Sequence, residues 1–427
     1  MTGFRVITPL DRPVDSVIRP PGSKSETIRA LVVAALAEGR STLRRPLDSE
    51  DTGFARRALG QLGVEVDAGD GQWVVGGSGG HLHPSPDPLD AGASGLTARA
   101  MIALAPLVDG PTTVVGRDRL PERPMAGLVE ALRALGVEAV DNEGRLPVTV
   151  HGTGALPGGK VVVDSHQTTQ FATALLMAAP LAATPLLIIP SGLEGSHRYL
   201  DLTVATMSEF GARVEQEDEG YRVWPTAYTA TGLEIEPDAS AAVYPMVAAA
   251  VTGGRVTIEG LGSRCIQPDM AVARVLGTMG CAVEQSEAGT TIDARGRPLR
   301  PVDVDLSGSP DGSLAVAVAA LFAEGPTRLR GLGSLRFKES DRLSALATEI
   351  TRLGSGARVE GTELLITPAN MRPTRIETYG DHRMAMSFAL VGLGVPGIEI
   401  ADPEVVAKTW PGYWDMLDGL SGGLGLI

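Results

Sequence analysis

Cysteine and histidine are scarce in this sequence of 427 residues. Cys265 and Cys281 are the two cysteines, and two cannot build a disulfide framework or a cysteine-ligated metal site. The six histidines are scattered, and none forms a His/Glu pair at the i, i+4 spacing of a helical zinc motif. The sequence therefore gives no support for a zinc site, and its low cysteine content suits a reducing compartment.

Long apolar runs and export signals are also missing. Aromatic residues make up 4% of the chain and apolar residues 43%, but Gly and Pro interrupt every apolar stretch before it could span a bilayer. The first residues, MTGFRVITPLDRP, have neither a basic nor an apolar leader region. We therefore expect a cytoplasmic protein with an aliphatic core.

Basic residues are in deficit. The chain has 37 Lys and Arg against 51 Asp and Glu, for a formal net charge of −14. This balance disfavours nucleic acid or an anionic membrane surface as the main partner, although it allows a local basic cleft. We expect small anionic substrates, no nucleic acid, no membrane and a monomer.

One type of segment occurs six times. The first example is Pro20–Gly39, in which a polar Gly/Ser/Lys loop up to Thr27 precedes an Ala/Val/Leu helix from Ile28. A helix that is apolar nearly all round is a buried helix. The five further copies have polar residues at the front and a turn at the back: Gly95–Gly110, Thr168–Ala183, Ala239–Gly254, Gly312–Gly325 and His382–Gly397.

A second pattern recurs with the first. An amphipathic helix such as Thr52–Leu62 ends in a glycine and a short strand follows, at Gly63, Gly136, Gly211, Gly280 and Gly354, which are 73, 75, 69 and 74 residues apart. Glycine adopts the left-handed turn at a helix end most easily. Each repeat therefore reads as strand, buried helix, strand, amphipathic helix and hairpin, while the Gly/Pro-rich stretch from Gly76 to Pro88 reads as a loop.

The repeats predict two domains of three units each, because one core is improbable at this length. Ala230–Pro237 is the candidate crossover between the third and fourth units. We expect one domain over 20–232 and a second over 1–19 with 233–427.

Charged and polar residues stand at the fronts of the predicted buried helices. A shared repeat position implies a shared end of each domain, where helix dipoles also favour anions. Arg and Lys with a few carboxylates suit a ligand that carries a carboxylate and phosphates. The front residues are Lys24, Ser25, Arg29, Arg99, Thr168, Thr169, Gln170, Asp238, Asp311, Asp381, His382 and Arg383.

Further polar residues follow the strands after these helices: Arg123, Ser196, Tyr199, Lys338, Glu339, Arg342 and Lys408. Any one charged residue is more often a solvated side chain than a ligand contact. Thr168, Thr169, Asp238 and Asp311 could be helix caps, which is the favoured interpretation for Asp238. His382 could equally be a packed core histidine. Neither Gly22–Ser25 nor Gly154–Lys160 matches the phosphate-binding loop pattern.

Six stretches together resemble the enolpyruvyl transferases. The resemblance runs from about residue 18 to residue 415 and is specific in combination. The stretches are PGSKSETIRALVVAALA, ERPMAGLVEALRALG, SHQTTQFATALLMAAPLA, FKESDRLSALATEI, YGDHRMAM and AKTWPGYW.

The resemblance implies an α/β fold of two domains, each with three βαβαββ repeats around buried parallel helices in an inside-out barrel, joined by a hinge crossover. It implies transfer of the enolpyruvyl group of phosphoenolpyruvate to the 5-hydroxyl of shikimate 3-phosphate, with release of phosphate, in the pathway to chorismate and aromatic amino acids. It implies no metal or organic cofactor.

The resemblance also assigns roles to residues of this sequence. Asp311 would take the hydroxyl proton, and Glu339 and Lys24 would handle the protons at C3 and the departing phosphate, in an order that stays open. The positions for phosphoenolpyruvate are Lys24, Gly95, Arg123, Gln170, Arg342, Arg383 and Lys408. The positions for shikimate 3-phosphate are Lys24, Ser25, Arg29, Thr168, Thr169, Gln170, Ser196, Asp311 and Lys338.

Three positions depart from the family pattern. The loop N-[AS]-G-T-x-x-R reads Ala93-Ser94-Gly95-Leu96-Thr97-Ala98-Arg99, the usual Ser-Ser-Gln reads Thr168-Thr169-Gln170, and Ser334 replaces an asparagine. Loss of a hydrogen-bonding side chain beside a buried polar ligand costs on the order of 1–3 kcal/mol. The altered loop leaves acceptor identity and glyphosate sensitivity open.

Three other functions are weighed against this one. A paralogue in specialised metabolism would keep the fold and act on a different shikimate-like cyclohexene acid. The UDP-N-acetylglucosamine enolpyruvyl transferases use a cysteine in the loop before the RP motif, and Arg117–Arg123 has none. A non-enzymatic scaffold would scatter its charges over all repeat faces, whereas here they share one repeat position.

Overall fold

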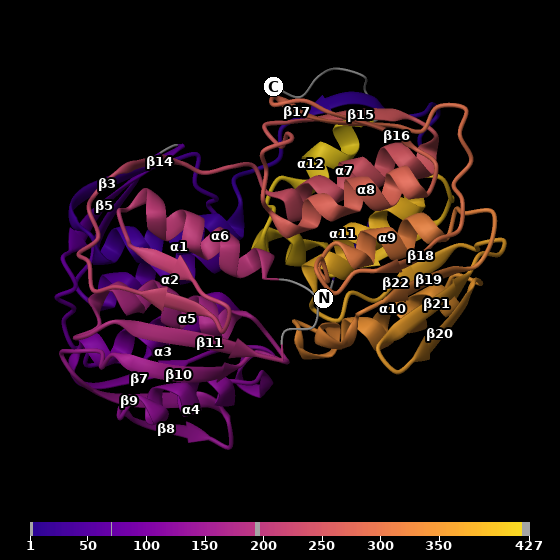
Figure 1. Cartoon of the computed structure of the whole chain (residues 1–427). Coiled ribbons are helices and arrows are strands. Elements are labelled where there is room, and N and C mark those ends of the chain that lie inside the picture. Colours follow the sequence, from indigo (N-terminus) through magenta and orange to yellow (C-terminus); the bar gives the residue numbers. More distant parts are fainter. Residues whose placement is uncertain (1–2, 70, 193–196, 421–427) are drawn as a thin grey trace. The chain divides into compact units, whose positions relative to one another are not determined.

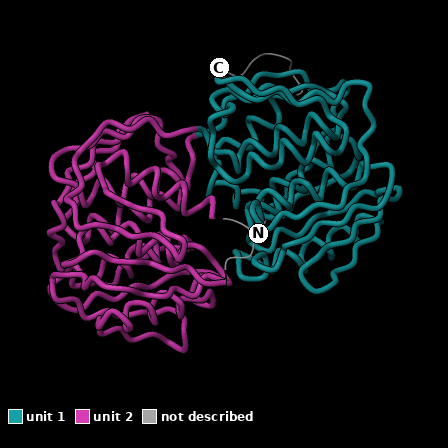
Figure 2. The backbone as a smooth tube through the Cα atoms, in the orientation of Figure 1, with its two compact units in different colours: residues 1–21, 237–427 teal, residues 22–236 magenta. Residues whose placement is uncertain are grey.

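The computed structural model describes residues 3–69, 71–192 and 197–420. The chain forms two compact units, unit 1 of Met1–Pro21 with Pro237–Ile427 and unit 2 of Gly22–Glu236 (Figure 2). Each unit has its own core, built around three buried helices with sheets on the outside (Figure 1). The α/β fold of repeated units predicted from the sequence is confirmed. The domain limits expected from the sequence, 20–232 for one domain and 1–19 with 233–427 for the other, stay a prediction.

Three apolar helices form the centre of unit 2. They are α1 (Lys24–Leu36), α3 (Gly95–Leu104) and α5 (Gln170–Ala178), and nearly all of their residues are buried. The other helical segments of this unit are α2 (Glu50–Gln61), η1 (Ala105–Leu107), η2 (Leu120–Glu122), α4 (Ala126–Ala134), η3 (Ala179–Leu181) and α6 (Arg198–Glu209).

Three four-stranded sheets surround these helices, in the orders β14-β3-β5-β4, β6-β7-β9-β8 and β10-β11-β13-β12. In each, the strand after the buried helix pairs parallel with an outer strand and antiparallel with a hairpin. The strands are β3 (Glu38–Arg44), β4 (Glu65–Gly69), β5 (Gln72–Ser78), β6 (Leu89–Asp90), β7 (Asp109–Val115), β8 (Glu138–Asn142), β9 (Arg145–Thr153), β10 (Gly159–Asp164), β11 (Leu186–Ser191), β12 (Val214–Gln216), β13 (Tyr221–Val223) and β14 (Gly232–Glu234).

Unit 1 repeats this plan around α7 (Ala239–Thr252), α9 (Ser313–Ala320) and α11 (His382–Ala389). Its sheets have the orders β16-β17-β15-β2, β18-β19-β21-β20 and β1-β23-β22. The strands are β1 (Phe4–Val6), β2 (Asp15–Ile18), β15 (Arg255–Glu259), β16 (Ala282–Gln285), β17 (Gly289–Asp293), β18 (Asp303–Asp305), β19 (Thr327–Arg330), β20 (Gly356–Glu360), β21 (Glu363–Thr367), β22 (Thr374–Ile376) and β23 (Ile398–Ala401). The remaining helical segments are η4 (Pro268–Met270), α8 (Ala271–Thr278), η5 (Gly333–Phe337), α10 (Arg342–Arg352), η6 (Leu390–Leu393), η7 (Pro403–Lys408) and α12 (Tyr413–Gly419).

Strands that are distant in sequence complete the sheets of both units. The strand β2 precedes unit 2 in sequence, yet it pairs parallel with β15 of unit 1. The strand β14 comes last in unit 2 and pairs parallel with β3, the first strand of that unit. The strand β1 pairs antiparallel with β23 and takes the place of a hairpin in the sixth repeat. Residues 4–18 therefore supply two strands to unit 1.

The predicted start of the first buried helix is wrong. The loop was expected to continue to Thr27, but α1 begins at Lys24. The buried Ser23 hydroxyl accepts a hydrogen bond from the Glu26 amide at 3.4 Å, and this N-cap lets the helix begin a turn earlier. Lys24 and Ser25 therefore lie on the first helical turn.

The glycines predicted to end the amphipathic helices all have positive φ. The values are 91° at Gly63, 87° at Gly136, 83° at Gly211, 112° at Gly280 and 100° at Gly354, which confirms the repeat period read from the sequence.

The predicted loop from Gly76 to Pro88 is wrong in its first residues, because β5 extends to Ser78. Glycine is needed there by close approach: a Cβ on Gly77 would lie 2.1 Å from the Ala37 carbonyl oxygen at the end of α1.

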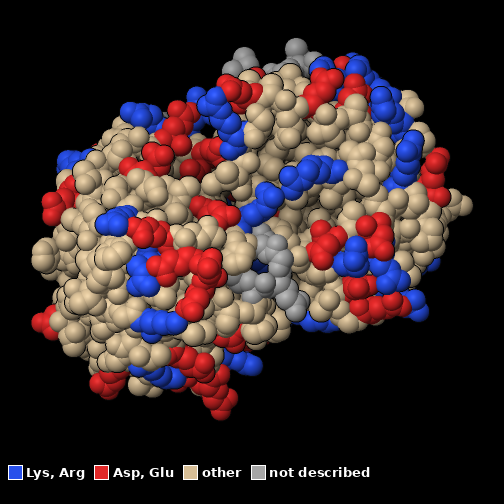
Figure 3. Space-filling model, in the orientation of Figure 1, with Lys and Arg blue, Asp and Glu red and all other residues tan. Residues whose placement is uncertain are grey.

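Among the described residues, no helix is both long enough and apolar enough to cross a membrane. On the face of each unit drawn in Figure 3, basic and acidic side chains are interspersed and form no continuous basic surface.

Candidate active site

Arg29 is a deeply buried predicted ligand residue of unit 2. It lies on α1 and is 2% exposed. Its guanidinium donates to the Thr203 hydroxyl at 2.8 Å and to the Ser25 carbonyl at 2.9 Å, with longer contacts to the Thr173 hydroxyl and the Tyr199 carbonyl. All four of these described acceptors are neutral oxygens. Burial lowers the Arg29 pKa to about 10. A buried cation among neutral acceptors is suited to an anionic ligand.

Two arginines of unit 2, Arg99 in α3 and Arg123 after η2, lie close to Gly95 at the start of α3. Arg99 Nη1 donates to the Gln170 side-chain oxygen at 2.6 Å, and Nη2 donates to the Pro124 carbonyl at 2.8 Å. The Arg99 guanidinium also lies over the Phe171 ring, 5.1 Å from its centroid. Arg123 is buried and ends η2. The structure therefore brings together side chains from two repeat fronts that the sequence placed together.

Gly95 leaves space for both guanidinium groups. A Cβ built on Gly95 would lie 2.4 Å from Arg99 Nη1 and 2.9 Å from Arg123 Cζ. The departure at Leu96 lies beside this glycine, and the Leu96 side chain is buried at 6% exposure. Ser94 caps α3, accepting hydrogen bonds from the Thr97 amide and hydroxyl.

We expect Gly95→Ala to raise about tenfold the KM for the anionic ligand that the resemblance assigns to this position, with a smaller change in kcat. The added methyl displaces one guanidinium, and losing one charge-assisted hydrogen bond costs about 1.5 kcal/mol or more. Steady-state kinetics measures this, with Gly136→Ala in the exposed turn after α4 as a control for general loss of stability. An unchanged KM would show that the guanidinium groups move aside without loss.

Lys24 lies at the front of α1 and forms an ion pair with Asp51, Nζ to Oδ2 3.2 Å, at the start of α2. The Lys24 side chain is 17% exposed and that of Asp51 is 3% exposed. Thr168 accepts a hydrogen bond from the Gln170 amide at 3.2 Å, whereas Thr169 makes no side-chain cap bond. Thr168, Thr169 and Gln170 are partly exposed, and Ser196 lies outside the described residues.

Arg342 is the centre of the charged cluster in unit 1. It begins α10, and its side chain is 1% exposed. The guanidinium contacts both Asp381 oxygens, Nε to Oδ2 2.8 Å and Nη2 to Oδ1 3.0 Å, and so binds this buried carboxylate in bidentate geometry. It also contacts Asp311 at 2.8 Å and Glu339 at 2.7 Å. These carboxylates raise the Arg342 pKa although burial lowers it.

Asp311 is bound by three cations. Its Oδ1 lies 3.2 Å from Lys338 Nζ and 2.8 Å from Arg342 Nη1, and its Oδ2 lies 3.2 Å from Arg383 Nη2. Burial raises the Asp311 pKa, but Lys338, Arg383 and Arg342 together hold the pKa well below its usual value. Asp311 stands before the Gly312 N-cap of α9 and is not its cap.

Of the other predicted residues of unit 1, Arg383 belongs to this cluster. Arg383 donates to the Tyr244 hydroxyl at 3.3 Å, and the carboxylates around it, Asp311 first, raise its pKa against the effect of burial. Lys408 is buried at the end of η7, which packs against α11. Ser334 lies in η5, four residues before Lys338.

Two interpretations of helix fronts are settled by the structure. Asp238 caps α7, as favoured from the sequence: its Oδ1 accepts from the Ser240 and Ala241 amides at 2.7 and 3.1 Å. His382 is fully buried, with Nδ1 3.7 Å from Asp381 Oδ1. It is the first residue of α11 and is a packed core histidine next to Asp381.

Several residues of these clusters were not singled out from the sequence. Asp51 pairs with Lys24, Ser340 donates to Asp381 at 3.0 Å, and Tyr244 contacts Arg383. Asp269 is fully buried beneath the Asp311 turn. For two of them the sequence contains one signal. Asp51 and Asp269 each lie at the start of an amphipathic helical segment, which is a repeat position other than the fronts of the buried helices.

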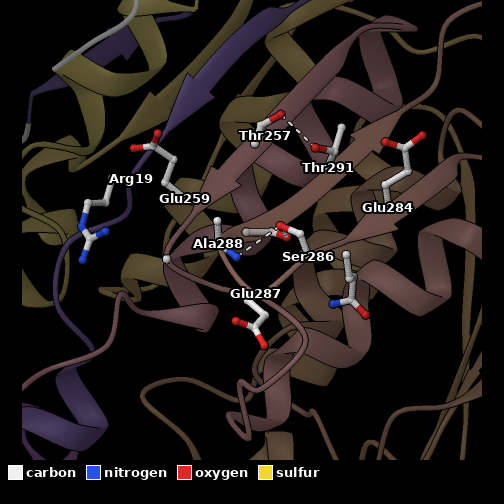
Figure 4. A pocket seen from close by; sticks show the side chains of 11 residues that line it. Arg19, Thr257, Glu259, Glu284, Ser286, Glu287, Ala288 and Thr291 are labelled. Carbon is white, nitrogen blue, oxygen red and sulfur yellow. Dashed lines mark hydrogen bonds between the residues drawn. The ribbon is translucent and has the colours of Figure 1, made fainter.

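A pocket of about 760 Å³ in unit 1 is formed apart from this cluster, on the sheet β16-β17-β15-β2. Thr257 and Thr291 face each other on it, hydrogen-bonded at 2.9 Å, with Glu259 and Glu284 to either side (Figure 4). Its carboxylates outnumber its one lining cation, Arg19, and none of the predicted site residues lines it. It does not suit anionic substrates. Within the described ranges, no group of three His, Cys, Asp or Glu is placed to hold a metal ion.

Comparison with known proteins gives one consistent family. The family model of EPSP synthase (3-phosphoshikimate 1-carboxyvinyltransferase) matches residues 10–417. Relatives named 3-phosphoshikimate 1-carboxyvinyltransferase include one from Methanoregula boonei, 38% identical and covering 94% of this chain and 96% of its own, and one from Photobacterium profundum, 39% identical and covering 96% and 97%.

Solved structures agree with this result. An EPSP synthase from Acinetobacter baumannii matches with a TM-score of 0.82 at 25% identity, over 98% of each chain. The enolpyruvyl transferase NikO from Streptomyces tendae shares the fold, with a TM-score of 0.76 at 17% identity over 98% of this chain and 97% of its own. The chain belongs to the EPSP synthase (3-phosphoshikimate 1-carboxyvinyltransferase) family.

Proposed function

We propose that this chain transfers the enolpyruvyl group of phosphoenolpyruvate to the 5-hydroxyl of shikimate 3-phosphate and releases phosphate, in the shikimate pathway to chorismate and aromatic amino acids. Membership of the EPSP synthase family supports this activity. The observation that carries it is the position of Asp311, a carboxylate held among Lys338, Arg342 and Arg383. This arrangement combines a base with cations that can bind anionic substrates.

In the proposed reaction, Asp311 takes the proton of the 5-hydroxyl while the hydroxyl oxygen adds to C2 of phosphoenolpyruvate. C3 gains a proton at the same stage and loses it when phosphate leaves, so the site needs an acid that becomes a base. Lys24 and Glu339 fill these roles at C3 and at the phosphate, and which of them protonates C3 is open. These steps use only side chains of the chain and the two substrates.

Binding of substrate anions would change the charge balance around Asp311. Arg342 and Arg383 contact Asp311 and are also proposed to bind the phosphoenolpyruvate carboxylate. When the substrate carboxylate binds these guanidinium groups, they stabilise the Asp311 carboxylate less. The Asp311 pKa then rises toward the working pH. Asp311 therefore becomes a stronger base when phosphoenolpyruvate binds.

The remaining ligand assignments follow the clusters. For phosphoenolpyruvate we propose Lys24, Gly95, Arg123, Gln170, Arg342, Arg383 and Lys408. For shikimate 3-phosphate we propose Lys24, Ser25, Arg29, Thr168, Thr169, Gln170, Ser196, Asp311 and Lys338. The neutral hydrogen-bond acceptors of the buried Arg29 guanidinium support its part in this set. We further propose a cytoplasmic monomer with domains of 20–232 and of 1–19 with 233–427.

A phosphate-release assay with phosphoenolpyruvate and a panel of ring acids tests this function. We expect phosphate release with shikimate 3-phosphate and none with unphosphorylated shikimate. Release with another cyclohexene acid, and none with shikimate 3-phosphate, would assign the chain to the paralogue hypothesis. Absence of release with every acceptor would contradict enzymatic transfer.

A further inference from the structure

Asp269 joins two segments at the front of unit 1. It lies in η4 and is 1% exposed. Its Oδ1 accepts from the Ser309 hydroxyl at 2.5 Å, and its Oδ2 accepts from the Ser240 hydroxyl. Ser309 is two residues before Asp311, whereas Ser240 is in the first turn of α7. One buried carboxylate therefore connects the Asp311 turn to a different repeat.

The turn that carries Asp311 packs tightly on the Asp269 segment. The Ser309 amide donates to the Leu306 carbonyl at 2.9 Å, and the Ser313 hydroxyl donates to the Pro310 carbonyl at 2.6 Å. A Cβ on Gly312 would lie 2.6 Å from Val272 Cγ2 and 2.8 Å from the Ser309 hydroxyl oxygen. The turn has no room to shift toward α8, and Ser309 anchors it there.

The residue before Pro268 fixes the same segment from the other side. Gln267 Nε2 donates to the Pro237 carbonyl at 2.8 Å, and Gln267 Oε1 accepts from the Ala239 amide at 3.0 Å. Both bonds are to the chain where it enters α7. Gln267 and Asp269 together hold the Asp311 turn at a fixed place relative to this helix front.

Charges around Asp269 place it within electrostatic reach of the cluster. Burial raises the Asp269 pKa and the Asp311 charge raises it further, while Arg383 lowers it. Asp269 thus accepts two hydroxyl hydrogen bonds and lies near other charges. A carboxylate with a packing role alone does not require such an environment.

We propose that Asp269 is a positioning residue, which fixes the Asp311 carboxylate against Arg342 and Arg383 through Ser309. The inference rests on the proposed function, because the role of Asp311 as base belongs to it. Small displacements of a reacting group cost large factors in rate while substrate binding changes less. Loss of Asp269 should therefore appear in kcat and much less in KM.

The test compares Asp269→Ala, Ser309→Ala and Asp269→Asn in the full chain. We expect the two alanine variants to lose about tenfold or more in kcat, with KM for both substrates within about threefold of wild type. Asparagine keeps an oxygen and a donor for the two serines, so kcat of Asp269→Asn stays within about threefold. Thr290→Val is the matched control: it removes a buried hydroxyl that donates to the Leu261 carbonyl at 2.7 Å, outside the cluster, and should lower Tm with kcat unchanged.

Crystal structures of wild type and Ser309→Ala supply a readout that does not need turnover. We expect the Ser309–Gly312 turn to move in the variant. A turn that stays in place, or kcat at the wild-type value in both alanine variants, overturns the inference. A wild-type protein without turnover on phosphoenolpyruvate and shikimate 3-phosphate refutes the proposed function instead, and the two crystal structures then decide the positioning role alone.

Discussion

Asp311→Asn should lower kcat by about 10²–10⁴-fold, the usual contribution of a positioned general base. The amide keeps one oxygen that can accept from Lys338 and Arg342, but it loses the acceptor that faces Arg383. It cannot take a proton from the 5-hydroxyl. Steady-state phosphate release with saturating phosphoenolpyruvate and shikimate 3-phosphate measures the loss.

Asp305→Asn is the matched control for this variant. Asp305 is an exposed aspartate on β18 of the same unit, and it accepts from the Ser307 amide at 2.8 Å. We expect wild-type kcat there. If Asp311→Asn also kept wild-type kcat, the proton would have to go to another group, and the assignment of Asp311 as base would be wrong.

The pH dependence of kcat gives a second view of Asp311. In the free protein its cations hold the Asp311 pKa well below the ordinary value of 3.8, so the carboxylate is ionised at neutral pH. In the proposed substrate complex, Arg342 and Arg383 also contact substrate anions, so the Asp311 pKa rises. Activity then falls as pH drops through this raised pKa, and the acid limb of kcat is absent in Asp311→Asn. An identical limb in both proteins would contradict this origin.

Arg342→Met should lower the free energy of unfolding by about 3–5 kcal/mol, because removing one partner of a buried pair leaves an uncompensated buried charge. Asp381 is fully buried, and two of its three side-chain donors in the cluster come from the Arg342 guanidinium. Methionine has a similar length and is apolar. Denaturant unfolding followed by circular dichroism measures the change.

Arg328→Met serves as the control for loss of an ordinary ion pair. Arg328 pairs with Glu363 at 2.8 Å, but its side chain is 39% exposed. Exposed pairs contribute about 0–1 kcal/mol, so we expect a change within that range. An equal decrease in the free energy of unfolding in the two variants would show that the buried ion pair with Asp381 stabilises the fold no more than an exposed pair does.

Most of the fold could be predicted from the sequence because the repeat imposes its own constraints. The helix-ending glycines have positive φ, and the six apolar stretches form the buried helices. Local signals were misread at two places. Ser23 starts α1 at Lys24, and close packing on Ala37 places glycines inside β5, where composition indicated a loop.

The candidate site could be predicted only in part, because partners far apart in sequence leave no local pattern. Position in the repeat grouped Asp311 with Arg383, which the structure brings to 3.2 Å. It could not show that Asp381 binds Arg342, or that Asp269 lies beneath the Asp311 turn. Such pairings depend on how three repeats close around one core, which no single repeat encodes.

The pairing of β1 with β23 imposes an order on folding during synthesis. Unit 2 is complete once Glu236 leaves the ribosome, but Phe4–Val6 pairs with Ile398–Ala401, nearly the whole chain later. At 5–20 residues per second, the first strand remains without its partner for roughly 20–80 s. A nascent chain stalled after Glu236 therefore carries one finished unit and an N-terminal strand that lacks its partner β23.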